Sequence, residues 1–137
     1  MKALFSTSLP GNYFHVSMLT ARLIAGSFML THGIPKLGRL TSGEEIKFAD
    51  PFGLGSAPSL ILVVFAEVFC SCCVILGLGT RIAPAILIFT MLVAAFHAHG
   101  DDPFATKEKA LLFAAIYFLL IVFGSGKNSI DRFIGRQ

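Results

Sequence analysis

Four apolar runs of helical length follow one another along this chain of 137 residues and constrain its fold more than any other feature. They cover about 14–32, 58–78, 82–99 and 107–124, and the last reaches this length only with its polar flanks. A helix that crosses the hydrocarbon core of a bilayer needs about 20 mainly apolar residues. The runs therefore predict an all-α fold, an integral membrane bundle of four transmembrane helices that forms one domain over residues 1–137.

The composition excludes the main alternatives to a membrane protein. Charged residues make up 14% of the chain and hydrophobic residues 55%, whereas a soluble domain carries about 25% charged residues. The net charge of +3 comes from scattered basic residues, which form no basic stripe interleaved with aromatic residues, so nucleic-acid binding is not expected. Lipid is the expected surroundings of this chain.

Four spans would place both termini on one side of the membrane, together with the short turn around Arg81. The Lys and Arg residues divide five against five between the two sides, which gives the positive-inside rule no preference. Six acidic residues lie on the side of the long loop, which should extend from about Lys36 to Pro58. We expect a multi-pass protein of the cell membrane with cytoplasmic termini.

Two charged residues, Arg22 and Glu67, lie inside the predicted spans. Ionisable groups within a span are costly and are functional candidates by default. Counted from the side of the termini, Arg22 should lie about 12 Å deep and Glu67 about 15 Å deep, at 1.5 Å per residue. The two side chains could then form a structural ion pair near mid-depth. Alternatively, they form a catalytic pair in which Glu67 accepts or relays a proton and Arg22 is its counter-ion.

A second polar group is predicted toward the side of the long loop. His32 closes the first run, where Gly33 and Pro35 should end the helix; Lys36 follows one turn later, and His97 closes the third run. These side chains could be interfacial groups that reach the lipid headgroups, or, with Glu67, polar contacts to a ligand in a wet pocket. His97 and His99 lie two apart on a helix and so face different directions, and no metal site is expected.

The cysteines also allow two interpretations. Cys70 and Cys73 form a C-x-x-C pattern, which in a redox protein can lower a thiol pKa and form a disulfide. Within an apolar helix the thiolate is disfavoured, and small residues favour close helix packing. Packing is the preferred interpretation of these cysteines.

Short motifs occur in a recognisable order. Arg22 and Gly26 precede a His-Gly-Ile-Pro-Lys segment at 32–36, Glu67 precedes Leu-Gly-Leu-Gly-Thr-Arg at 76–81, and Gly-Ser-Gly at 124–126 precedes Ser-Ile-Asp at 129–131. In these elements the chain resembles the DoxX family of small four-helix integral membrane proteins. Ser125 departs from the family pattern, in which Pro usually stands between the two glycines.

The resemblance implies a membrane subunit of a redox system that is linked to quinones or to thiol and sulfur chemistry. Catalysis itself stays open; a catalytic chain would be an oxidoreductase subunit with a quinone as its cofactor and redox proteins as its partners. Glu67 and Arg22 would then be catalytic, and His32, Lys36 and His97 would bind the cofactor. The alternatives are a non-catalytic scaffold for soluble redox enzymes and an ion pathway, the latter only if the chain forms a homo-oligomer.

Overall fold

A computed structural model describes residues 11–135, and every regular element among them is helical. The elements are α1 (Gly11–Thr41), α2 (Ser56–Val64), η2 (Phe65–Cys70), α3 (Ser71–Leu76), α4 (Ile82–Val93), η3 (Ala94–Ala98), α5 (Phe104–Phe123) and α6 (Ile130–Ile134). The two η elements are π-helical turns that continue their neighbours. The second long helix is therefore α2–η2–α3 and the third is α4–η3.

The four predicted runs are helical, which confirms the all-α class. Two of the described helices, α1 and the helix over Ser56–Leu76, are long and apolar enough to cross a membrane, and the helix over Ile82–Ala98 is apolar but shorter. The first run is longer than predicted, because α1 continues through Gly33 and Pro35 to Thr41. The long loop is correspondingly shorter and covers residues 42–55.

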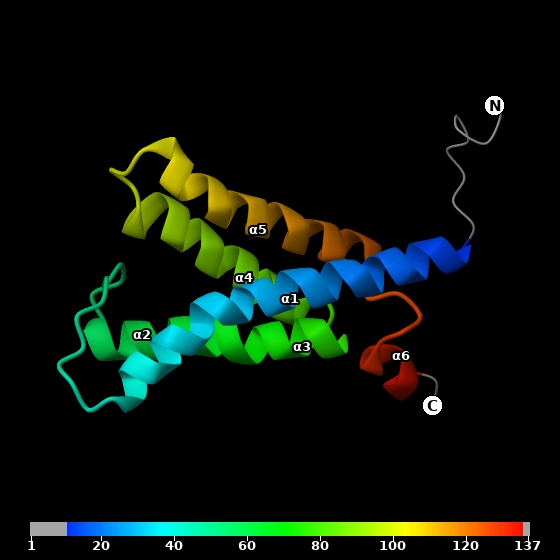
Figure 1. The fold of residues 1–137 in the computed structure, drawn as a ribbon, viewed down its shortest axis with the longest axis horizontal. Helices are drawn as coiled ribbons and strands as arrows, with labels where there is room; N and C mark the ends of the chain where they lie inside the picture. The colour runs from blue at the N-terminus through cyan, green and yellow to red at the C-terminus, as the bar shows by residue number, and fades with distance from the viewer. Residues whose placement is uncertain (1–10, 136–137) are drawn as a thin grey trace.

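Figure 1 shows α4 and α5 side by side and α1 crossing in front of the α2–η2–α3 helix, while α4 also packs directly against η2 and α3. The start of α1, the turn between α3 and α4, and α6 lie at one end of the molecule. The 42–55 loop and the turn between η3 and α5 lie at the opposite end, which we call the loop end. A single core of buried apolar residues joins the helices, with Leu87, Met91 and Tyr117 among its members.

Regular seams of buried and half-buried residues join α1 to the second helix. The seam positions alternate three and four residues apart, as in coiled-coil packing. They are Arg22, Gly26, Met29, Gly33 and Lys36 on one helix, and Leu60, Val64, Glu67, Ser71 and Val74 on the other. Three charged residues therefore occupy positions where a seam normally holds apolar side chains.

Two glycines set the contact between these helices. A Cβ atom on Gly33 would lie 2.8 Å from Val68 and 3.0 Å from the Cβ of Glu67. A Cβ atom on Gly26 would lie 2.4 Å from the Ile75 side chain. Because only glycine fits at such separations, these contacts fix the register, and they place Gly33 beside Glu67.

Candidate functional site

The centre of the candidate site is an ion pair between α1 and η2. The Nζ atom of Lys36 donates hydrogen bonds to both carboxylate oxygens of Glu67, at 2.5 and 2.6 Å. The Glu67 side chain is 4% exposed and that of Lys36 is 27% exposed. Glu67 lies in a π-helical turn, a feature that is common at functional sites. The cation beside Glu67 is Lys36, whereas the sequence predicted Arg22 in that position.

The predicted pairing of Arg22 with Glu67 is wrong. The guanidinium of Arg22 donates instead to two backbone carbonyls of the C-terminal segment, that of Ser125 at 2.8 Å and that of Asn128 at 2.6 Å. The close contact of Gly33 with Glu67 sets the register of the two helices. Arg22 is eleven residues from Gly33, about 16 Å along α1 at 1.5 Å per residue. Counting depth from the ends of the apolar runs could not reveal this offset.

Arg22 belongs to a second polar cluster at the other end of the molecule. There Asp131 accepts hydrogen bonds from the Gly79 amide at 2.9 Å, from the Thr80 amide at 2.7 Å and from the Thr80 hydroxyl. Burial raises the pKa of Asp131, but these bonds and the nearby charge of Arg22 outweigh burial and hold it below its usual range. The cluster fastens the C-terminal segment to the bundle, which is a structural function.

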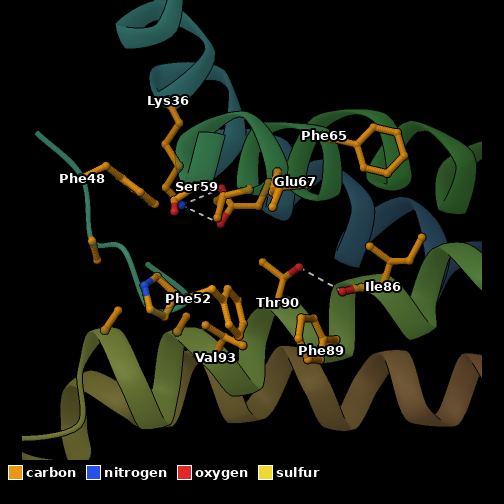
Figure 2. Close-up of a pocket in the computed structure, with 16 residues that line it drawn as sticks. Lys36, Phe48, Phe52, Ser59, Phe65, Glu67, Ile86, Phe89, Thr90 and Val93 are labelled. Carbon is orange, nitrogen blue, oxygen red and sulfur yellow. Dashed lines mark hydrogen bonds and ion pairs between the residues drawn. The ribbon is translucent and has the colours of Figure 1, made fainter. Parts of the chain in front are cut away.

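A large cavity adjoins the Lys36–Glu67 pair, and we call it the apolar cavity. It has a volume of about 320 Å³ and is lined by Lys36 of α1 and by residues of α2, η2, α4, η3 and the 42–55 loop (Figure 2). Its polar side chains are those of Lys36, Glu67, Ser59 and Thr90. The remaining lining is apolar and includes Phe48, Phe52, Phe65 and Phe89.

The 42–55 loop, which lines part of this cavity, is attached to the start of α2. Asp50 accepts hydrogen bonds from the Gly55 amide at 2.7 Å, the Leu54 amide at 2.9 Å and the Ser59 hydroxyl at 2.9 Å. The bond from Gly55 is the main reason that the pKa of Asp50 lies below its usual range. Phe52 stacks on Phe89 of α4, with ring centroids 6.1 Å apart. These contacts hold the loop across the cavity.

A smaller cavity of about 130 Å³ lies on the other side of the ion pair, between α1, α4 and α5, and we call it the polar cavity. Lys36 and Glu67 line it together with His32, Thr106 and Lys109. The ring of His32 stands edge-on to that of Phe113, with centroids 6.0 Å apart. His32 and Lys36 thus line the same cavity as Glu67.

The remaining predicted residues lie outside this centre. His97 is exposed on η3 and lines neither cavity. His99 contacts Asp102 at 2.7 Å in the turn before α5. Cys70 is buried, Cys73 is half-buried, and both are free thiols. Among residues 11–135 no three His, Cys, Asp or Glu side chains are grouped so that they could hold a metal ion.

Sequence reasoning did not identify three contributors to the site. Ser59, Thr90 and the loop around Phe52 become visible only when the helices pack, because none of them belongs to a charged or spaced motif. One pattern in the sequence could have identified the pair. Lys36 and Glu67 each belong to a row of seam positions that alternate three and four residues apart along their helix. That spacing would have placed Lys36 on the same face of α1 as Arg22.

The fold and the site define a class: a helical membrane protein whose bundle buries a lysine–glutamate pair between an apolar and a polar cavity. The chain belongs to the DoxX family, because the DoxX family model matches residues 17–100. The match includes α1, the helix with Glu67 and the helix with His97, and so confirms the resemblance. Neither a search of characterised proteins nor one of solved structures gives a significant match.

Proposed function

We propose that this protein is the membrane subunit of a redox system and binds a quinone-like ligand in the apolar cavity, against the Lys36–Glu67 pair. The observation that carries the proposal is this pair, buried in the wall of a cavity that is otherwise almost entirely apolar. Burying ionisable groups within a membrane protein costs free energy, and such groups are therefore functional candidates by default.

The proposal includes a four-span topology in the cell membrane, with cytoplasmic termini. Large apolar side chains are exposed on all four long helices, as lipid-facing surfaces require. Examples are Phe28 and Ile34 on α1, Ile61 and Phe69 on the second helix, Leu92 and Phe96 on the third, and Phe118 and Val122 on α5. The third helix and α5 would complete the bundle beside the two long apolar helices, although α5 begins with charged residues.

The residues that line the apolar cavity fit a ligand with a flat ring and polar oxygens. Its volume falls within the range of small-molecule sites, about 300–1,000 Å³. Aromatic side chains offer faces for ring stacking. The hydroxyls of Ser59 and Thr90 already donate, to Asp50 and to the Ile86 carbonyl, so toward a ligand they can only accept.

Lys36 is therefore the donor available to a ligand carbonyl. Its ammonium group has three protons, and two of them point to the oxygens of Glu67. The third could bind a ligand oxygen, which would orient the ring in the cavity. The Glu67 carboxylate is placed to take up a proton from a ligand hydroxyl, while Lys36 balances its charge. A quinone would supply two-electron, proton-coupled chemistry, with the electrons exchanged with a redox partner protein.

The experiment is to purify the protein in mild detergent, extract it with organic solvent and measure bound quinone by mass spectrometry. We expect quinone in the unchanged protein and its loss in Val93→Trp, because Val93 lines the apolar cavity. Leu92→Trp is the matched control, because Leu92 is exposed and lines neither cavity.

Two results would contradict the proposal. One is the absence of quinone from the unchanged protein together with no quinone-dependent activity toward thiosulfate or thiols. The other is equal quinone content in Val93→Trp and Leu92→Trp. If either occurs and crosslinking still captures soluble redox enzymes, the non-catalytic scaffold is the better description.

A further inference from the structure

The Lys36–Glu67 pair separates two cavities of different chemical character. Lys36, Glu67 and Ala94 line both of them. On one side the wall is mainly aromatic and aliphatic, and the 42–55 loop forms part of it. On the other side His32, Thr106 and Lys109 contribute polar atoms.

The polar cavity leads from the surface to the pair. Thr106 and Lys109, in the first two turns of α5, are exposed, and His32 is exposed on α1. Glu67 is 3% exposed at the inner end. Polar side chains thus lie at the outer and the inner end of this cavity, and the rest of its wall is formed by Met29, Met91, Ala94, Ala110 and Phe113.

We propose that the polar cavity is a water-filled passage through which Glu67 exchanges protons with the solvent at the loop end, while the apolar cavity stays closed to water. The inference rests on the proposed function, because it names the route by which a proton accepted at Glu67 leaves the protein. A carboxylate that takes protons from a ligand on one side needs such an exit on the other side.

The side chains around the polar cavity support proton exchange between Glu67 and the loop end. The titratable side chains that face the pair are His32 of α1 and Lys109 and Tyr117 of α5, whereas α4 and η3 contribute Met91 and Ala94 to the passage. Tyr117 is buried and its hydroxyl donates to the Ala25 carbonyl.

The first test measures water in each cavity with a charged, membrane-impermeant thiol reagent on protein in lipid nanodiscs. Ala110→Cys places a thiol in the polar cavity, and Val93→Cys places one in the apolar cavity; both positions are half-buried. Labelling is counted on the peptide that carries the new cysteine, which separates it from Cys70, Cys72 and Cys73. Since the reagent needs a hydrated thiolate, we expect Ala110→Cys to react at least about tenfold faster. Equal rates, or a faster Val93→Cys, would overturn the inference.

The second test follows access to Glu67 itself. A water-soluble carbodiimide activates a carboxylate, and the adjacent Lys36 amine can then displace the urea to form an amide, with net loss of one water. We expect this crosslink in the unchanged protein, its loss in Ala110→Trp, and its retention in Ala115→Trp, whose site on α5 is exposed and lines neither cavity.

The two proposals can fail independently. Bound quinone together with an unreactive Ala110→Cys would leave the ligand site standing and remove the passage. A crosslink that persists in Ala110→Trp would mean that Glu67 is reached by another route. If Ala110→Trp does not fold, the thiol measurement decides, because cysteine is close to alanine in size.

Discussion

Lys36 and Glu67 share one contact but differ in their access to solvent. Lys36 can extend its ammonium group toward water along its aliphatic stem, because its side chain is 27% exposed. The Glu67 carboxylate is 4% exposed and has no such route. Removing Lys36 and removing Glu67 should therefore lower the free energy of unfolding by different amounts, because a different charge stays behind in each case.

We expect Lys36→Met to lower the free energy of unfolding by about 3–5 kcal/mol, because it leaves an unpaired buried carboxylate. Glu67→Gln should lower it by about 1–2 kcal/mol, since the remaining lysine can reach water and the amide can still accept a hydrogen bond. The double variant Lys36→Met/Glu67→Leu should recover most of the loss. Denaturant unfolding in mixed micelles measures all three.

The exposed pair of Lys47 and Glu45 is the control for these variants. Its atoms are 3.8 Å apart and both side chains are 84% exposed. Lys47→Met should change the free energy of unfolding by less than about 0.5 kcal/mol. Equal losses for Lys36→Met and Glu67→Gln would show that the pair is not buried as described.

Asp131 gives a second prediction, on acid stability. Its folded pKa lies below its usual range, so its contribution is complete above the unfolded pKa of about 3.9 and is lost as the pH falls through the folded value. Asp131→Asn should cost about 1–3 kcal/mol at pH 7, because charge-assisted hydrogen bonds are lost. The difference from the unchanged protein should shrink as the pH falls below about 4.

Thermal unfolding at pH 7 and pH 3 checks this prediction. Asp101→Asn is the matched control, since Asp101 is an exposed carboxylate in the turn before α5. An Asp131→Asn variant as stable as the unchanged protein at pH 7 would mean that the C-terminal segment is not fastened by these bonds.

At the scale of elements, the packing of α1 against the second helix determines the site. Within α1, Gly26 and Gly33 are in close contact with the second helix, whereas a Cβ atom added at Gly38 would meet no atom within 4 Å. Replacing glycine by alanine should therefore have opposite effects on the free energy of unfolding at Gly33 and at Gly38.

Gly33→Ala should destabilise the protein by about 1–3 kcal/mol, because the added methyl group forces α1 away from η2. Gly38→Ala should stabilise it by about 0.5–1 kcal/mol, since alanine has the higher helix propensity. Unfolding in mixed micelles measures both variants. Gly33→Ala should also loosen the Lys36–Glu67 contact, which is only three residues away on α1. A neutral Gly33→Ala would contradict the close approach of these helices.

At the scale of the whole molecule, the two ends of the bundle hold different groups of residues. One end holds the structural cluster of Arg22 and Asp131, and the other holds the loop, the ion pair and the mouth of the polar cavity. If four helices span the membrane, these ends face opposite aqueous compartments. The proposed proton exit then opens on the side away from the termini.

The proposed topology can be tested with single cysteines and an impermeant reagent. Glu45→Cys, in the 42–55 loop, should be labelled from outside intact cells, and Arg81→Cys, in the turn between α3 and α4, only in inverted vesicles. Both positions are exposed, so access depends on membrane side alone. Labelling of both from the same side would exclude the four-span arrangement.

The sequence by itself determined the approximate positions of the helices and the all-α class, because apolar runs and interrupting charges are local features. It placed Glu67, Lys36 and His32 on the list of candidates, and the motif order pointed to the family. The ends of α1 were less predictable, since Gly33 and Pro35 are ordinary stop signals but here lie inside the helix.

Only the tertiary structure decided which cation pairs with Glu67. Arg22 and Lys36 lie on one face of α1, fourteen residues apart, so the choice depends on how far that helix slides along its partner. The close contacts of Gly26 and Gly33 fix this register, and they join segments distant in the chain. The same packing brings the 42–55 loop over the pair and creates the two cavities, because a cavity exists only between elements that have already met.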